Sequence, residues 1–298
     1  MANPRVLDKR RKSVRNIKKI TRTMELIATA RFKKAMDRAS AATSYTDRIT
    51  QLVSDLTRAG LQVSHPLLEK RAEVKNAALL VLTANRGLCG GFNGNLIRAG
   101  QGQFAELKAL VPNCTLQVSG KRGISGLKYR GIPIDKQYTQ FEDKPRFDEV
   151  DAIATLLLDD YATGKLDRLD VVYTKFLSIA KQVVTVETLL PLGSLDLNAG
   201  KGDSKQESTM GPKHQYEFLP SPESILEEVV PTSFKVKLFK CFLDSAVSEQ
   251  IARMVAMKSA TENANDLIKS LSRQYNRARQ GRITNELMDL IGGVEAIS

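Results

Sequence analysis

Tryptophan is absent from this 298-residue chain, and aromatic residues make up only 6% of it. So small a supply of rings disfavours a surface built to stack nucleic-acid bases. Histidine is scarce as well, because His65 and His214 are the only two and no HExxH motif occurs. These shortages argue against a histidine-rich zinc site. The length is nevertheless sufficient to bury a core in one large or two modest domains.

Cysteine is rare: Cys89, Cys114 and Cys241 are an odd number and form no CxxC motif. This usage argues against a disulfide scaffold and favours a reducing compartment. Long apolar runs are missing too, since the longest, AALLVL at 77–82, is far shorter than the roughly 20 residues that a membrane-spanning helix needs. The N-terminal region has no hydrophobic segment typical of a secretory signal, so a soluble protein is predicted.

Positive charge is concentrated at one end of the chain. Residues 1–38 contain 13 Lys/Arg and 3 Asp/Glu, a net charge of +10, whereas the remaining 260 residues contain 32 and 30, a net charge of +2. Such a segment either binds an acidic partner (nucleic acid, an anionic membrane surface or an acidic protein) or is only a solvated helix face.

Residues 3–58 are predicted to form one helix. Asn3 suits the N-cap, Pro4 the first helical position and Gly60 the stop, and no Pro or Gly lies between. Within this helix, small or apolar residues recur every seven positions. Such a repeat is typical of a coiled coil. The first row of the repeat is Leu7, Val14, Thr21, Ala28, Ala35, Ala42, Ile49 and Leu56; the second is Arg10, Ile17, Met24, Arg31, Arg38, Tyr45 and Leu52.

The middle of the chain alternates strands and helices, which predicts an α/β layer with a largely parallel sheet. The expected strands are 74–83, 115–119, 134–141, 169–176 and 182–190, and the expected helices are a segment ending near 110, then 119–129 and 147–162. The Gly/Ser/Lys-rich stretch 193–213 is expected to be a flexible loop.

A second long helix is predicted after Ser221-Pro222, with Pro231 breaking or kinking its first part. Its apolar row is Val236, Phe239, Leu243, Val247, Ile251, Met254, Met257, Ala264, Ile268, Leu271, Tyr275 and Ala278. The simplest architecture has three parts, 1–60, 61–220 and 221–298. The terminal helices form an antiparallel coiled-coil shaft, and a Rossmann-like α/β domain is inserted between them.

The glycine-rich turn NRGLCGGFNG at 85–94 follows a predicted strand but lacks both GK[ST] and GxGxxG. Its glycines are therefore interpreted as serving a tight turn that needs positive φ. Cys89 lies in this turn and is expected to be partly exposed, but no adjacent histidine activates it. No catalytic, cofactor-binding or metal site is predicted.

Three segments carry a family resemblance: KKITRTMELIATARFKKA at 18–35, NRGLCGGFN at 85–93 and the long stretch 248–293. In this order they resemble the gamma subunit of F-type ATP synthases. The loop 193–213 contains no cysteine, unlike the dithiol-bearing insertion of the plant chloroplast branch, so the bacterial type fits better.

The resemblance implies a central-stalk rotor subunit that is not catalytic by itself and needs no cofactor. In this family the coiled coil turns inside a hexamer of alpha and beta subunits, which hold the nucleotide sites. The α/β foot sits on the c-ring and contacts epsilon. Proton- or sodium-driven rotation of that ring changes the conformation of the hexamer and drives ATP synthesis. The resemblance places the chain peripherally on the cytoplasmic face of the bacterial inner membrane, without nucleic acid as a partner.

Individual positions match the family's motifs. The residues implied to contact the catalytic subunits are Met24, Arg253, Arg279, Gln280, Thr284 and Glu286; those implied to form a basic shaft face are Lys9, Arg10, Arg11, Lys12, Arg15, Lys18, Lys19 and Arg22. Tyr216 and Phe218 match the foot contact, although Leu219 stands where the family often carries Glu. Arg253 and Arg279 are expected to be exposed and about 39 Å apart along one helix, exchanging partners as the shaft turns.

Two other functions remain open at this point. A basic coiled-coil nucleic-acid-binding protein would explain the N-terminal charge and predicts salt-dependent duplex binding. It does not explain an α/β domain between two matched helices. A stand-alone nucleotide enzyme would hydrolyse ATP as an isolated chain.

Overall fold

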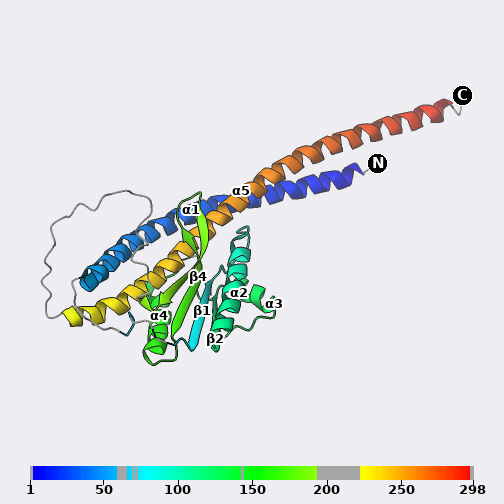
Figure 1. The fold of residues 1–298 in the computed structure, drawn as a ribbon. Coiled ribbons are helices and arrows are strands. Elements are labelled where there is room, and N and C mark those ends of the chain that lie inside the picture. Colours follow the sequence, from blue (N-terminus) through cyan, green and yellow to red (C-terminus); the bar gives the residue numbers. More distant parts are fainter. Residues whose placement is uncertain are drawn as a thin grey trace. The chain divides into compact units, whose positions relative to one another are not determined.

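The structure, a computed structural model, describes residues 3–58, 66–68, 71, 73–141, 144–192 and 222–295. It contains five helices and five strands in these ranges: α1 (Pro4–Arg58), β1 (Asn76–Leu82), α2 (Phe92–Leu110), β2 (Asn113–Ser119), α3 (Lys121–Tyr129), β3 (Lys136–Tyr138), α4 (Phe147–Ala162), β4 (Arg168–Phe176), β5 (Gln182–Leu190) and α5 (Pro222–Glu295) (Figure 1). The chain divides into two compact units, one of residues 1–31 and 252–298 and the other of residues 32–251. Each long helix contributes to both units. The predicted domain boundaries at residues 60 and 220 follow a different division of the chain and stay a prediction.

Helix α1 begins where its cap predicts. The Asn3 side chain accepts a hydrogen bond of 3.0 Å from the backbone N–H of Arg5, which satisfies one of the free donors at a helix start. In the first predicted row Leu7, Thr21 and Ala28 are buried, while Val14, Ala35 and Ala42 are half-buried. The row is therefore confirmed within the described side chains, and Ile49, Leu56 and Gly60 lie outside them.

The second predicted row of α1 is wrong. Ile17, Arg10 and Arg38 are exposed, and only Met24 and Arg31 are half-buried; the side chains of Tyr45 and Leu52 lie outside the described set. The second row that is withdrawn from solvent lies four residues after the first one and comprises Arg11, Lys18, Glu25, Phe32 and Ala39. The charged members hide this row from an apolar pattern, because long polar side chains cover a seam with their aliphatic stems.

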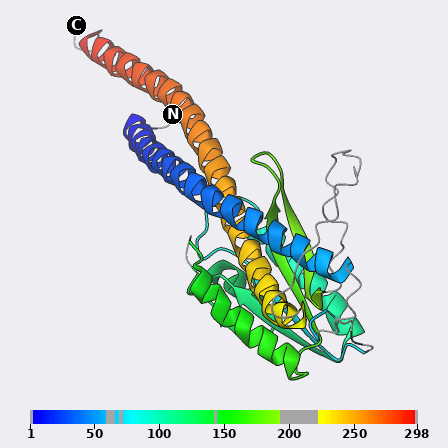
Figure 2. The same cartoon turned by 90° about the vertical axis from the view of Figure 1, so that its left-hand side faces the viewer.

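The five strands form one sheet in the order β3-β2-β1-β4-β5. Strands β1, β2, β3 and β4 pair in parallel, and β5 pairs antiparallel with β4. Figure 2 shows the β4–β5 hairpin extending from the sheet. The predicted, largely parallel sheet is confirmed.

Helices cover both faces of this sheet. Helix α2 packs on β1, where Gly100 lies against Val81. On the other face α4 and the first part of α5 enclose a core that includes Leu157, Phe234 and Leu238. Because each parallel crossover is right-handed, α2 and α3 lie on one face and the returning α4 lies on the other.

Helix α5 runs without interruption through Pro231, so the predicted break at that residue is wrong. A proline in a helix removes one hydrogen bond and crowds the preceding turn. Val230 and Phe234 on either side are fully buried in the sheet core. Their burial, worth roughly 1.5–3 kcal/mol for each large side chain, offsets that loss.

Within the second unit, α1 and α5 pack against each other through small and apolar residues. Ala39 of α1 lies in one buried cluster with Leu243, Val247 and Ile251 of α5. Phe176, at the end of β4, packs on the same cluster. The predicted apolar row of α5 is thus confirmed here.

Candidate functional site: the paired helices of the first unit

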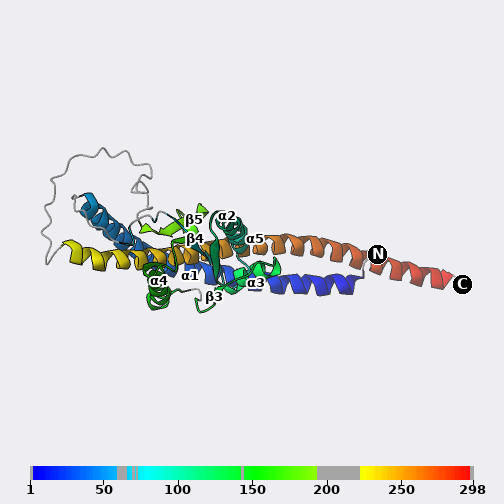
Figure 3. The same ribbon diagram turned by 60° about the horizontal axis from the view of Figure 1, so that its bottom comes forward.

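Residues 3–31 of α1 and 252–295 of α5 run antiparallel and form the first unit (Figure 3). Thr21 and Thr261 mark the contact, since their hydroxyl oxygens lie 2.8 Å apart and share a hydrogen bond. Ala28 and Ala264 are also buried in this unit. Small side chains at these positions let two backbones approach closely, which makes a narrow and stiff pair.

Closer to the N-terminus, aromatic and charged groups replace the small residues in the seam. The Arg11 guanidinium lies 4.7 Å from the centre of the Tyr275 ring. Its Nη2 also lies 2.6 Å from Asp8 Oδ1, while Lys12 Nζ lies 3.0 Å from the other carboxylate oxygen. Hydrogen bonds from Lys12 and Arg11 hold the pKa of Asp8 below its ordinary value.

The predicted basic face is therefore divided between two environments. Arg11 and Lys18 are half-buried on the seam. The exposed members are Lys9, Arg10, Lys12, Arg15, Lys19 and Arg22. Arg22 is paired on its own helix with Glu25 at 2.8 Å. Most of the cations thus lie where another molecule can contact them.

Helix α1 also carries exposed apolar side chains, on a different side of the helix from most of these cations. Val6, Ile17, Ile20 and Ile27 of α1 are all exposed large hydrophobic residues. Their spacing places them along one face of the helix. A row of apolar residues that the chain itself leaves uncovered is typical of a surface that another protein covers.

The side chains in the last turns of α5 are exposed to solvent. All residues from 282 to 294 are exposed. They include large apolar side chains at helical spacing, namely Ile283, Leu287, Leu290, Ile291 and Val294. A helix of this kind has no reason to be stable alone, because most helical stability in proteins comes from packing of an apolar face. The apolar side chains of this tip are therefore accessible to another protein.

Four of the predicted contact residues, Arg279, Gln280, Thr284 and Glu286, lie on these turns or directly before them. Arg279 and Glu286 line an open groove of about 410 Å³ that Tyr275 and Asp8 also line. The Arg279 guanidinium lies 6.0 Å from the Tyr275 ring centre. Two predicted residues lie on the same stretch, because the Thr284 hydroxyl donates to the Gln280 carbonyl at 3.0 Å. All four are exposed, as expected.

Arg253 differs from the other predicted contacts. Its side chain is only 8% exposed, so the expectation of an exposed, sliding arginine is wrong for this residue. Every residue from 241 to 251 on the same helix is buried, and Arg253 follows after the half-buried Ala252. A motif match gives the position of a residue but not its exposure. Met24 is half-buried.

Several predicted features lie outside the described residues. These are the foot residues Tyr216 and Phe218 and the loop 193–213.

The glycine-rich turn is a packed structural element. Gly90 has a φ of 55°, which supports the turn interpretation at that residue, and Leu88 has a φ of 63°. Cys89 is 2% exposed, so the expectation of a partly exposed thiol is wrong. Asn93 explains its burial: Nδ2 donates to Cys89 Sγ at 3.1 Å, while Oδ1 accepts the Ala84 N–H at 2.9 Å.

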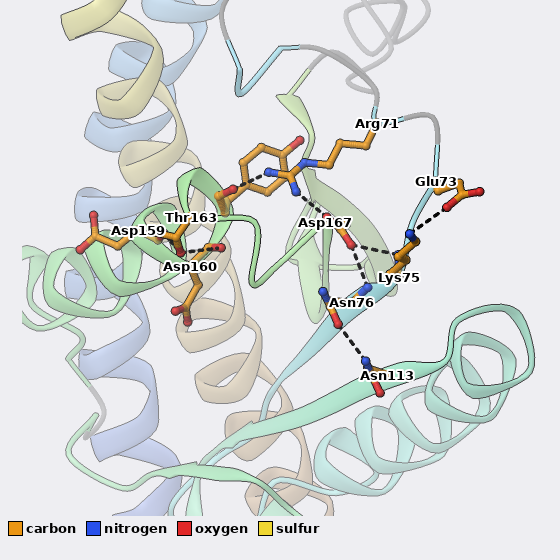
Figure 4. Close-up of polar contacts among 10 residues, drawn as sticks. Arg71, Glu73, Lys75, Asn76, Asn113, Asp159, Asp160, Thr163 and Asp167 are labelled. Atoms are coloured by element: carbon orange, nitrogen blue, oxygen red, sulfur yellow. Dashed lines mark hydrogen bonds and ion pairs between the residues drawn. The ribbon is translucent and has the colours of Figure 1, made fainter.

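A polar clamp, formed by Arg71 and Asp167 at the amino ends of β1 and β4, was not predicted from the sequence (Figure 4). The Asp167 carboxylate accepts the backbone N–H groups of Lys75 and Asn76 at 2.9 and 2.8 Å and lies 2.5 Å from Arg71 Nη1. The Arg71 guanidinium lies 4.6 Å from the Tyr161 ring centre. Burial alone would raise the pKa of Asp167, but these hydrogen bonds lower it.

The clamp ties the segment before β1 to the start of β4. Arg71 and Asp167 are 96 residues apart, so no spacing rule could have paired them. Its buried geometry indicates a structural role.

Comparisons with known proteins agree on one family. The family model described as ATP synthase matches residues 3–297. The ATP synthase gamma chain of Rhodopirellula baltica is 61% identical over 297 residues, covering 100% of this chain and 99% of that one. The ATP synthase gamma chain of Rhodospirillum rubrum is 40% identical over 302 residues, with 100% of both chains covered.

Solved structures share the fold. A chain of the Euglena gracilis mitochondrial ATP synthase (OSCP/F1/c-ring) superposes with a TM-score of 0.65 at 18% identity, covering 99% of this chain and 94% of that one. A chain of the Tetrahymena thermophila mitochondrial ATP synthase central stalk and c-ring superposes with a TM-score of 0.58 at 22% identity, covering 81% and 99%. By its sequence over the whole length, this chain belongs to the ATP synthase gamma chain family.

Proposed function

We propose that this chain is the central-stalk rotor subunit of an ATP synthase. Rotation of a c-ring, driven by protons or sodium ions, turns the paired helices inside a hexamer of alpha and beta subunits. The observation that carries the proposal is the exposed apolar end of α5 (282–294), together with an α1 surface that has exposed apolar side chains on one side and mostly cations on the other. Both surfaces fit a shaft that another protein surrounds.

The paired helices can transmit rotation because they are stiff and differ around their circumference. Their seam is held by the Thr21–Thr261 hydrogen bond and by Arg11 stacked on Tyr275. Different side chains, apolar on one azimuth and cationic on another, face a given partner as the shaft turns. A partner loop with different affinity for these faces changes its conformational population at each angle. The nucleotide chemistry then takes place on the partners, and this chain contributes no catalytic residue.

The remaining partners are assigned to the second unit. Its α/β domain would stand on the c-ring and bind epsilon, as a peripheral protein on the cytoplasmic face of a bacterial inner membrane. Within the described residues no helix is both long and apolar enough to span a bilayer.

The alternative of a nucleic-acid-binding coiled coil has no support among the relatives, which are ATP synthase gamma chains. The cations on the seam also serve the helix pair, since Arg11 stacks on Tyr275. Purification of the chain from its own cells tests the proposal, because alpha and beta subunits should accompany it in high salt. Recovery with nucleic acid and without these subunits would contradict it.

Replacing Arg279 with Ala is expected to lower ATP-driven ion pumping more than assembly or folding. Arg279 is exposed at the tip, and exposed charges contribute only about 0–1 kcal/mol to stability. The purified complex would be checked for subunit stoichiometry, and hydrolysis and pumping would then be measured in vesicles.

Arg253→Ala is the contrasting variant. Arg253 is buried and has interaction partners, so its removal is expected to destabilise the isolated chain by about 1–3 kcal/mol. Normal pumping in the Arg279 variant would remove that residue from the coupling path. Equal unfolding midpoints of the Arg253 variant and the parent chain would contradict its structural role.

Activity of the complex is expected to be the same with and without dithiothreitol. Cys89 and Cys241 are buried and Cys114 is half-buried. Burial raises the pKa of the Cys114 thiol, which keeps it in its less reactive form. A several-fold rise in ATPase rate on reduction, lost in a Cys89→Ala/Cys114→Ala variant, would overturn this expectation.

A further inference from the structure

Tyr275 of α5 is the only aromatic residue in the first unit. Its side chain is half-buried, and two guanidinium groups lie near its ring. That of Arg11, which belongs to α1, is 4.7 Å from the ring centre, and that of Arg279, one turn further along α5, is 6.0 Å from it. A single ring therefore interacts with one cation from each helix of the pair.

Arg11 is held on this ring by its own helix. Its Nη2 lies 2.6 Å from an oxygen of Asp8, one turn earlier on α1, and its side chain is 20% exposed. Lys12, which is paired with the other oxygen of the same carboxylate, is 72% exposed. The buried Nε of Arg11 has no hydrogen-bond partner among the described residues, and an unpaired buried donor is unfavourable. The Asp8 carboxylate and the Tyr275 ring are therefore the groups that hold Arg11 in the seam.

Arg279 has fewer partners than the other guanidiniums around it. Arg282, which lines the same groove, is paired with Glu286 at 2.7 Å. Arg279 forms no hydrogen bond or ion pair with the described residues, and the ring of Tyr275 is the one group that orients it. The donors of Arg279 are thus available to another molecule.

Stacking on a ring orders a guanidinium without using its hydrogen bonds. The five N–H donors lie in the plane of the group, so they point away past the edge of the ring. The contact also restricts the rotamers of a long side chain before binding, and binding then has less conformational entropy to remove. Because Arg11 fixes the ring from the other helix, the orientation of Arg279 is tied to both helices.

We propose that Tyr275 is a positioning residue for coupling, and that its ring, held from α1 by Arg11, preorders Arg279 for contact with a catalytic subunit. This role rests on the proposed function, which supplies the contact that Arg279 makes. The ring is the acting group, because the Tyr275 hydroxyl forms no hydrogen bond with the described residues. Phenylalanine can therefore replace Tyr275, and an aliphatic side chain cannot.

The test compares purified complexes in vesicles by the ratio of ATP-driven ion pumping to ATP hydrolysis. Tyr275→Phe keeps the ring and should retain the parent ratio. Tyr275→Leu should lower the ratio about five-fold, which is about 1 kcal/mol at 1.4 kcal/mol per ten-fold change and matches an exposed cation–π contact. Leu271→Ala is the control for packing, since Leu271 is half-buried one turn earlier in the same row, and it should leave the ratio unchanged.

A double-mutant cycle shows whether Tyr275 acts through Arg279. Arg279→Ala alone should lower the ratio. Adding Tyr275→Leu to it should cause less than about a two-fold further loss, because two residues that act through one contact are not additive. Additive losses in the double variant would overturn the inference. Parent-like coupling in Tyr275→Leu, an equal loss in Tyr275→Phe, or an equal loss in Leu271→Ala would do so as well.

The isolated full chain gives a readout that does not depend on the proposed function. In nuclear magnetic resonance spectra the ring should shift the Nε–H proton resonances of Arg11 and Arg279 upfield. This shift should persist in Tyr275→Phe and disappear in Tyr275→Leu. Resonances at the same positions in the parent and in Tyr275→Leu would show that the ring orders neither arginine and would overturn the inference. Recovery of alpha and beta subunits with the chain is scored separately and tests the proposed function.

Discussion

Replacing Gly120 with Ala is expected to destabilise the second unit by about 2–6 kcal/mol. Gly120 connects β2 to α3 with a φ of +100°, and a Cβ there would lie 2.1 Å from the Thr83 carbonyl oxygen. A non-glycine residue at such a φ costs about 1–3 kcal/mol. Overpacking against rigid backbone adds about 1–3 kcal/mol more.

Gly131→Ala is the matched control for this variant. Gly131 also has a positive φ, +72°, but nothing lies within 4 Å of the position that its Cβ would occupy. Only the cost of a positive φ in a non-glycine residue applies here, so a loss of about 1 kcal/mol in stability is expected. Urea unfolding of the isolated chain, followed by far-ultraviolet circular dichroism, measures both. Equal losses in the two variants would show that the contact with Thr83 has no energetic effect.

Asp244→Asn is expected to stabilise the chain at pH 8 and to have little effect near pH 4. Asp244 of α5 is 5% exposed. Burial raises the pKa of its carboxyl to about 6, against the opposing effect of Lys240 and Lys175, while Glu187 raises it further. The Phe176 backbone N–H also donates a hydrogen bond to Asp244, and this lowers the pKa.

The direction of this pH effect follows from the linkage between proton binding and folding. In the unfolded chain an aspartate titrates near 3.8, below the folded value of about 6. The folded state therefore favours the protonated form, and this contribution to stability is complete below pH 4 and lost as the pH rises through 6. Above that pH the charged Asp244 costs about 2–3 kcal/mol, at 1.36 kcal/mol per pKa unit. Asparagine keeps an acceptor for Phe176 without this charge.

Unfolding midpoints of the two chains between pH 4 and pH 8 measure the effect. Asp159→Asn, a change at an exposed residue of α4, serves as the control and should leave the pH dependence unchanged. A stability difference between Asp244→Asn and the parent that is constant with pH would contradict the assignment of the raised pKa to Asp244.

Local patterns in the sequence were sufficient to predict the elements of secondary structure. The predicted helix at 147–162 has the bounds of α4, and the predicted strand at 182–190 has those of β5. Asn3 and Pro222 mark the helix starts as expected. These features depend on side-chain periodicity and on capping groups within a few residues, so that nothing distant is needed to determine them.

Other features depended on the tertiary structure. Packing decides which second row of α1 faces the other long helix. Charged residues such as Arg11 and Lys18 occupy that row, so an apolar pattern does not reveal it. The burial of Arg253, the passage of α5 through Pro231 and the pairing of Arg71 with Asp167 are decided in the same way. In each case the favourable energy comes from groups far apart in the chain.

The sequence alone determined the family, the two long helices, the alternating strands and the positive charge of the N-terminal segment, all of which are local or additive properties. Only the tertiary structure decided where charge and apolar area lie in space. It placed the cations of α2 and α3 on one face of the sheet and the acids of α4 on the other, and it left the end of α5 bare. Exposure depends on what the folded chain brings next to each side chain, and no residue carries that information by itself.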